Sequence, residues 1–158
     1  MYIEENTKVH QLMAKRVTVA KPDNKFSEAL ELFQTYKLRH LPIVDDNDVL
    51  LGIVSSNDLS KKFAEVAMQK DVFTNADLNK NLKLEDIMTR NVVTMHPDDL
   101  IKDMTKILDE NNISSVLVTD DDNKVVGIVT DKDLVHFLNL IFNHMDKLSR
   151  GSFGRAQG

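Results

Sequence analysis

Apolar side chains recur every three or four residues in four stretches of the chain, a spacing that is typical of amphipathic helices. Two of these stretches lie within residues 26–37 and 101–112, and two more begin near Ser56 and near Asp131. The pattern therefore predicts four helices, arranged as two pairs along the chain.

Short runs rich in Val, Ile and Leu lie between the predicted helices. They occupy residues 17–19, 41–44 and 49–54 in the first half and residues 92–94, 116–118 and 125–129 in the second half. β-Branched residues favour strands. The nearly continuous apolar character of the last two runs in each half is typical of strands covered on both faces. Each half is therefore predicted to fold as β-α-β-β-α.

The two halves are copies of each other. Residues 9–60 align without a gap with residues 84–135, and Gly52-Ile53-Val54-Ser55 falls on Gly127-Ile128-Val129-Thr130. One copy alone would bury too little apolar surface to fold stably. We therefore expect an α/β (α+β) protein in which two repeats pack together and share a core.

The repeat sets the expected organisation of the chain. Residues 1–71 hold the first repeat with an N-terminal segment, and residues 84–145 hold the second repeat. Residues 72–83, rich in Asn and Asp, are predicted to be a polar linker. Residues 146–158 show no periodicity and are predicted to be a flexible tail. The repeats use nearly the whole chain, which leaves no room for a fused catalytic domain.

Composition limits the cellular location and the classes of binding partner that we expect. The chain of 158 residues has no cysteine, which excludes disulfides and thiolate chemistry and favours a cytoplasmic location. Its net charge is −5 and its densest charge runs are acidic, so we expect no nucleic-acid partner. These acidic runs, at 45–48 and 120–122, are interpreted as solvated turns. We expect no membrane span, and the acidic first six residues lack the apolar core of a signal peptide.

Motifs of catalysis are missing from the sequence. None of the five histidines has metal-ligand spacing, and there is no nucleophile elbow, Walker loop or dinucleotide-binding glycine motif. Asp98 and Asp99 follow a Pro at a helix start, where the helix dipole accounts for them. We therefore expect no enzymatic activity.

A polar motif follows the last strand of each copy: Ser55 three residues before Asp58, and Thr130 three residues before Asp133. One interpretation is a capping box, in which the two side chains bond each other's backbone at a helix start. The other is a binding site, because a helix N-terminus attracts phosphate and a carboxylate beside it can accept the hydroxyls of a ribose. The residues by themselves support both interpretations.

These features resemble the CBS domain, named after cystathionine β-synthase. The resemblance is carried by Asp-Ile-Met-Thr at 86–89, by Thr-x-x-Pro at 94–97 and by the doubled Gly-h-h-[Ser/Thr]-x-x-Asp-Leu motif, where h is apolar. In this family two repeats form a pseudo-twofold unit, the Bateman module, which binds AMP, ADP, ATP or S-adenosylmethionine in clefts between the repeats. The modules commonly dimerise through their helices. The resemblance implies a stand-alone, non-catalytic regulatory sensor that signals to a partner by a change of conformation or dimer packing.

The resemblance also implies roles for single residues. Asp58 and Asp133 would bind ribose, with Ser55 and Thr130 near the phosphate. Arg39 and His40 occupy a position where the family often carries phosphate ligands, although a helix-end pair would look the same.

The adenine would contact Thr94 of the Thr-x-x-Pro motif, and Thr18 less securely in the first copy, where Val19 holds the matching position. Ile53 and Ile128 could form walls of the adenine slots or be plain core residues.

The copies differ where phosphate would bind. The first copy has Arg39-His40 where the second has Ser114-Ser115, and the second has Lys132 where the first has Asn57. We therefore predict unequal sites, one holding a phosphorylated ligand firmly and one weaker or less dependent on an anion. An alternative function is a ligand-independent dimerisation and protein-interaction scaffold. A third is an enzyme subunit completed by a partner.

Overall fold

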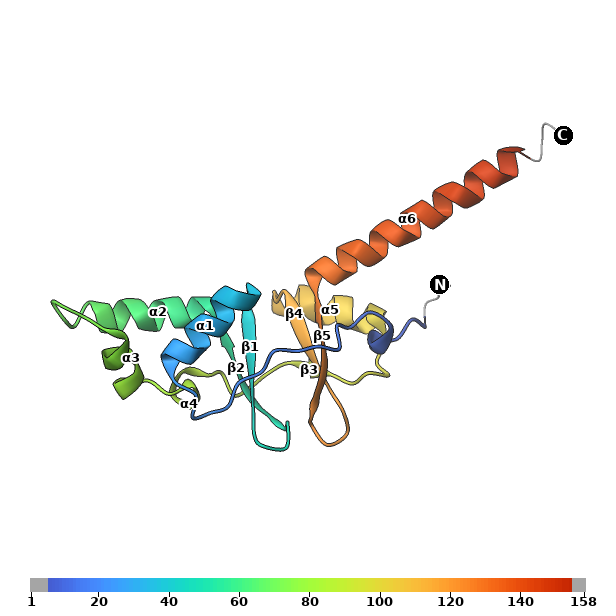
Figure 1. Cartoon of the computed structure of the whole chain (residues 1–158). Coiled ribbons are helices and arrows are strands. Elements are labelled where there is room, and N and C mark those ends of the chain that lie inside the picture. Colours follow the sequence, from blue (N-terminus) through green and yellow to red (C-terminus); the bar gives the residue numbers. More distant parts are fainter. Residues whose placement is uncertain (1–5, 155–158) are drawn as a thin grey trace. The chain divides into compact units, whose positions relative to one another are not determined.

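The computed structural model describes residues 6–154 (Figure 1). Its elements in chain order are a 3₁₀ turn η1 (Val9–Gln11), α1 (Phe26–Tyr36), β1 (His40–Val44), β2 (Leu50–Ser55), α2 (Ser56–Ala67), α3 (Asn75–Asn81), α4 (Leu84–Ile87), β3 (Thr94–Met95), α5 (Ile101–Asn111), β4 (Ser115–Thr119), β5 (Val125–Thr130) and α6 (Asp131–Gly154). This mixture of helices and strands in two repeats confirms the predicted fold class. Most of the N-terminal segment judged for a signal peptide, and residues 155–158 of the expected tail, lie outside the described residues.

The chain forms two compact units that differ from the two sequence repeats. One unit consists of the chain up to Lys15, Thr94–Val118 and the chain from Val126 onwards. The other consists of Arg16–Val93 and Thr119–Val125. We call them the Asp133 unit and the Asp58 unit, after the acidic residue predicted to bind ribose in each. The expected division at residues 71 and 84 therefore does not coincide with the compact units.

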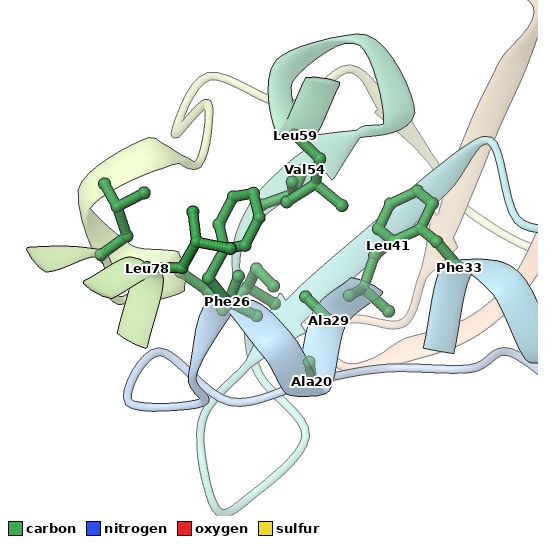
Figure 2. Packing of buried hydrophobic residues seen from close by; sticks show 11 residues of the cluster. Ala20, Phe26, Ala29, Phe33, Leu41, Val54, Leu59 and Leu78 are labelled. Carbon is green, nitrogen blue, oxygen red and sulfur yellow. The ribbon is translucent and has the colours of Figure 1, made fainter. Parts of the chain in front are cut away.

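The Asp58 unit is built on the antiparallel pair β1–β2, in which His40 lies opposite Ser55 and Leu41 opposite Val54. Ala20 forms a parallel bridge to Ile43 on β1. The helices α1, α2 and α3 supply apolar side chains to one core, shown in Figure 2. Its buried members are Ala20, Phe26, Ala29, Phe33, Leu41, Ile43, Val54, Leu59, Leu78, Leu82 and Leu84.

The Asp133 unit repeats this plan. Its sheet has the order β3-β4-β5, with Thr94 of β3 opposite Leu117 of β4 in a parallel pair. The core residues come from η1, α5, α6 and the strands. They are Val9, Met95, Ile101, Met104, Leu108, Val116, Val118, Val129 and Phe137.

Each unit takes a short segment from the other repeat. In the Asp133 unit, the backbones of Ala14 and Ile128 exchange hydrogen bonds of 2.9 and 3.0 Å. In the Asp58 unit, Thr89 and Ile53 exchange two of 2.9 Å. Apolar residues of the segments fill the cores: Val9 in one unit and Leu84 in the other are both fully buried. The N-terminal segment of each repeat therefore belongs physically to the body of the other repeat.

Helix ends and turns are built alike in both copies. Lys37 caps the end of α1 and Asn112 caps the end of α5, each with φ of 51°, a left-handed conformation that carries the chain into the next strand. The acidic runs form the turns after β1 and β4. Asp45 Oδ1 accepts hydrogen bonds from the backbone two and four residues on, at 2.8 and 3.0 Å, and Asp120 Oδ1 does the same at 3.0 and 2.9 Å. This geometry confirms the interpretation of the acidic runs as turns.

Two strand expectations need correction. Residues 17–19 form no strand, because the chain pairs with β1 only at Ala20. The strands β2 and β5 are not covered equally on both faces. Along β2 the residues alternate between buried and half-buried, and from Gly127 onwards β5 does the same. The strands β1 and β4 are buried from their second residue onwards, as expected.

The expected linker and tail also contain structure. Residues 75–81 form α3, and its Leu78 is fully buried in the core of the Asp58 unit. The helix α6 continues past residue 145 to Gly154. Residues 145–150 contain neither Pro nor Gly, so they can extend a helix without a local break.

Candidate functional site

In the Asp58 unit the predicted motif forms a capping box at the start of α2. The Ser55 Oγ accepts a hydrogen bond of 3.1 Å from the Asp58 backbone N–H. The Asp58 Oδ2 accepts one of 3.1 Å from the Ser55 backbone N–H. Both residues are half-buried. The cap uses Oδ2 of the carboxylate, and Oδ1 takes no part in it. The capping interpretation is therefore confirmed, and it leaves one oxygen of Asp58 for another contact.

The Asp133 unit has the same arrangement at the start of α6. The Asp133 Oδ2 accepts hydrogen bonds from the Thr130 backbone N–H at 2.9 Å and from its hydroxyl at 3.2 Å. The Asp133 backbone N–H lies 3.3 Å from Thr130 Oγ1. The Asp133 Oδ1 again takes no part in the cap. Both carboxylates are thus fixed in orientation before any ligand arrives, which lowers the entropy that binding would cost.

A backbone hydrogen bond fixes each helix start against the strand that precedes it in the sheet. The Ser56 N–H donates to the Arg39 carbonyl at 2.9 Å, and the Asp131 N–H donates to the Ser114 carbonyl at 2.8 Å. In the Asp58 unit this bond brings the predicted phosphate ligands Arg39 and His40 next to Ser55 and the α2 N-terminus. Arg39, His40, Ser55 and Asp58 therefore lie in one unit, a grouping that the sequence did not assign.

Arg39, His40 and Asp58 are titratable side chains at this end of the Asp58 unit. Arg39 is exposed and makes no ion pair with any residue that the structure describes. His40 is half-buried, and burial lowers the pKa of its imidazole below the ordinary 6.5. The neighbouring Arg39 charge lowers this pKa further, and the Asp58 carboxylate opposes the shift. His40 is therefore mostly neutral at pH 7 and gains charge as the solution is acidified.

The two helix starts differ at their second residue. In α6 the Lys132 backbone N–H donates to Asp131 Oδ1 at 2.8 Å. In α2 the matching positions are Ser56 and Asn57, where no such acid exists. A carboxylate therefore occupies part of the anion-attracting end of α6 but not of α2. The sequence pattern did not predict this contribution of Asp131, which directly follows Thr130.

The residues predicted to contact adenine lie at the strands. Thr94 is half-buried on β3, and Thr18 is half-buried two residues before the Ala20 bridge. Ile53 and Ile128 are half-buried on β2 and β5, between residues that are buried. Because side chains alternate across a strand, both isoleucines face away from the side that carries Val54 and Val129 into the cores. Neither belongs to the buried core of its unit.

Other kinds of site find no support in residues 6–154. No group of three or more His, Asp or Glu side chains there is placed to hold a metal ion. No helix in the same part of the chain is both long and apolar enough to cross a membrane.

Comparison with known families decides the identity of the repeat. The model of the CBS domain matches residues 9–65 and 84–140, which include both helix starts with their capping boxes. The chain belongs to the CBS domain family. Its two matched segments form a CBS pair, as the resemblance predicted.

Solved CBS pairs are similar to this chain over most of its length. The CBS domain pair of protein MJ0100, solved in complex with 5′-methylthioadenosine and S-adenosyl-L-methionine, is 32% identical with a TM-score of 0.69. The comparison covers 84% of this chain and 96% of that chain. CBSX2 of Arabidopsis thaliana, solved in complex with AMP, is 28% identical with a TM-score of 0.72. It covers 85% of this chain and 98% of that chain.

Curated relatives include large proteins with their own activities. The L-aspartate semialdehyde sulfurtransferase of Methanocaldococcus jannaschii is 35% identical over 128 residues, which cover 81% of this chain and 22% of that protein. The chain spans between 22% and 40% of the length of the first curated relatives that it matches. The CBS pair is therefore the part that these proteins share with the chain.

Proposed function

We propose that this CBS pair is a regulatory module that binds an adenosine-containing ligand through the carboxylates of Asp58 and Asp133. The observation that carries the proposal is the pair of capping boxes, which hold both carboxylates by Oδ2. The second oxygen of each carboxylate takes no part in the cap. A ribose offers two neighbouring hydroxyls, and a charged acceptor forms a strong hydrogen bond with such a donor.

Support for an adenosine ligand comes from similar proteins. The MJ0100 pair binds 5′-methylthioadenosine and S-adenosyl-L-methionine, and CBSX2 binds AMP. These ligands share adenosine and differ in charge. Ile53 and Ile128, which face away from the cores, are the apolar surfaces that we assign to the base, with Thr94 and Thr18 near its polar edge.

The charges at the two helix starts favour different ligands. Arg39, His40 and the start of α2, which has no acid matching Asp131, favour a phosphorylated nucleotide such as AMP, ADP or ATP in the Asp58 unit. In the Asp133 unit, Lys132 adds a cation but Asp131 adds an anion that already occupies a backbone N–H. This unit is therefore suited to a ligand with less negative charge, such as S-adenosylmethionine.

We infer that binding signals by changing the populations of two conformations or dimer packings that a partner protein distinguishes. A ligand can shift such populations only by binding one state more tightly than the other. The caps place the ligand contacts at the start of α2 and of α6, so these two helices are the elements through which the change would pass.

Calorimetric titration with AMP, ADP, ATP and S-adenosylmethionine tests the proposal. We expect at least one ligand to bind, and a ligand at 100 times its Kd to raise stability by about 2.7 kcal/mol. In a thermal-shift assay this corresponds to roughly 5–10 °C for a domain of this size.

Matched variants separate binding from capping. Asp58→Asn and Asp133→Asn keep an oxygen for the cap but lose the charge, so affinity should fall on the order of 10- to 100-fold. Asp86 is the control, because it caps α4 through a 3.2 Å bond from the Lys83 N–H in the same way. Asp86→Asn should leave affinity unchanged. Binding that is insensitive to Asp58→Asn and Asp133→Asn would overturn the assigned site, and no binding of any ligand at millimolar concentration would favour the scaffold function.

A further inference from the structure

A methionine recurs at the same position in the two segments that the repeats exchange, residues 9–14 and 84–89. Met13 lies in the segment that the first repeat gives to the Asp133 unit, and Met88 lies in the segment that the second repeat gives to the Asp58 unit. Both are half-buried and pack on the core of the unit that receives them. Met88 belongs to the Asp-Ile-Met-Thr motif, for which the proposed function has no role.

Each methionine sulfur occupies the space that a glycine leaves on the strand beneath it. A Cβ added to Gly127 on β5 would lie 2.5 Å from the Met13 Sδ, and a Cβ added to Gly52 on β2 would lie 2.7 Å from the Met88 Sδ. Both distances are well inside the roughly 3.5 Å at which nonbonded heavy atoms pack. Between the sulfur and the glycine there is therefore no room for another atom.

The sulfur contact lies next to the backbone bridge that pairs each segment with its strand. Ala14, the residue after Met13, exchanges hydrogen bonds with Ile128, and Thr89, the residue after Met88, exchanges them with Ile53. A methionine that left its place above the glycine would remove the packing beside this bridge. The segment would then be held less firmly on the strand that leads into the capping box.

We propose that Met13 and Met88 are oxidation sites, at which a peroxide forms sulfoxides that loosen the exchanged segments. The peroxide O–O bond breaks as one oxygen atom is transferred to sulfur. The sulfur is oxidised by two electrons, and hydrogen peroxide is reduced to water. The new S=O group is polar and larger than the thioether, so it cannot keep the place above the glycine. The chain has seven methionines and no cysteine, so the thioethers are its sulfur groups open to oxidation.

The other methionines of the described chain provide internal comparisons. Met68 is 88% exposed and Met145 is 57% exposed, and neither packs on a core, so their oxidation should leave both units intact. Met95 and Met104 are buried, at 5% and 0% exposure, so an oxidant should reach them only when the Asp133 unit opens. The half-buried Met13 and Met88 should therefore react after the exposed pair and before the buried pair.

Limited oxidation of the full chain with hydrogen peroxide tests the proposal, with peptide mass spectrometry to locate each sulfoxide and thermal unfolding to measure its effect. Each sulfoxide at Met13 or Met88 should lower the folding equilibrium constant roughly tenfold, because a polar group loses its place in the packing. Together they should lower the Tm by roughly 5–10 °C. Failure of Met13 and Met88 to react before the buried pair would overturn the assignment of the oxidation sites.

Two double variants separate the proposed sites from the exposed methionines. Met13→Leu/Met88→Leu nearly conserves side-chain volume and cannot be oxidised at these positions, so limited oxidation should leave its Tm almost unchanged. Met68→Leu/Met145→Leu is the matched control and should lose stability on oxidation as the native chain does. Equal losses in Met13→Leu/Met88→Leu and the native chain would overturn the proposal.

A polar replacement tests the loosening without an oxidant. Met13→Gln/Met88→Gln should lower the Tm by a similar roughly 5–10 °C, whereas Met68→Gln/Met145→Gln should not. A native Tm for Met13→Gln/Met88→Gln would overturn the link between the methionines and the segments.

An effect of oxidation on ligand affinity rests on the proposed function, because Ile53 and Ile128 are the surfaces assigned to the base. Calorimetric titration with AMP should show affinity at least fivefold lower after limited oxidation of the native chain and unchanged in Met13→Leu/Met88→Leu. Equal affinities before and after oxidation would overturn this effect. If no adenosine ligand binds the untreated chain, the proposed function fails, whereas the stability measurements still decide whether the two methionines are oxidation sites.

Discussion

Two glycines at matching positions should respond differently to the same substitution. Gly52 and Gly127 both lie under a methionine from the segment that the other repeat contributes, Met88 and Met13 respectively. Neither glycine has positive φ, so the backbone itself accepts Ala. In a strand with open space, Gly→Ala would stabilise by roughly 0.5–1 kcal/mol. Any loss of stability therefore reports the contact with the overlying segment.

The added methyl group meets different neighbours at the two positions. At Gly127 a Cβ would lie 2.5 Å from the Met13 Sδ and 2.9 Å from its Cγ, atoms that a flexible side chain can move. At Gly52 it would lie 2.7 Å from the Met88 Sδ and 2.8 Å from the Thr89 carbonyl oxygen. That oxygen accepts the 2.9 Å bond from the Ile53 N–H, so it cannot move without breaking the bridge.

We expect Gly127→Ala to cost about 1 kcal/mol of unfolding free energy and Gly52→Ala about 2–3 kcal/mol, within the range for overpacked sites. Urea denaturation of both variants measures the difference. In a double-mutant cycle, adding Met13→Ala should restore most of the unfolding free energy that Gly127→Ala loses through the clash. Adding Met88→Ala should restore little of the unfolding free energy that Gly52→Ala loses, because the Thr89 carbonyl oxygen remains in place. Equal costs, or full recovery at Gly52, would refute the reasoning.

Two further predictions concern the expected linker and the histidine near α2. Leu78→Ala should lower the unfolding free energy by about 2–5 kcal/mol in urea denaturation, because Leu78 is fully buried. The control Leu140→Ala, at a partly exposed position, should change the unfolding free energy little. A loss below about 0.5 kcal/mol for Leu78→Ala would mean that α3 only connects the repeats. The pKa of His40 is lowered in the folded protein, so below its ordinary value of 6.5 the unfolded chain binds more protons. Stability should therefore fall as the pH drops through 6.5, and His40→Gln should flatten this part of the Tm profile. An unchanged profile would contradict the shift.

The repeat made much of the fold predictable. Because the same pattern occurs twice, a helix beginning at Ser56 and another at Asp131 supported each other, and both begin there. The capping box was one of the two interpretations that the sequence supported, since Ser or Thr followed by an acid three residues on is a local signal. Those residues are also the centre of the candidate site, so its helix starts could be located from the sequence.

What could not be predicted depends on contacts distant in sequence. Leu78 and Leu82 lie in a segment rich in Asn and Asp, and only the three-dimensional core shows why these two leucines matter. The exchange that places Val9 and Leu84 in cores formed mainly by the other repeat leaves no local signal, because either packing satisfies the same apolar pattern. Likewise, the sequence alone did not show whether the Ile53 side chain faces the core or away from it, because this depends on the strand register.

The exchange of segments determines which unit a substitution in an N-terminal segment destabilises. A substitution at Val9 lies, by sequence, in the copy that contains Asp58, yet it would loosen the unit that holds Asp133. A substitution at Leu84 would do the reverse. A fragment cut at the middle of the chain would also leave each piece without part of its own interior. The effect of a substitution in the N-terminal segment of one copy should therefore be measured first in the unit that holds the acidic residue of the other copy.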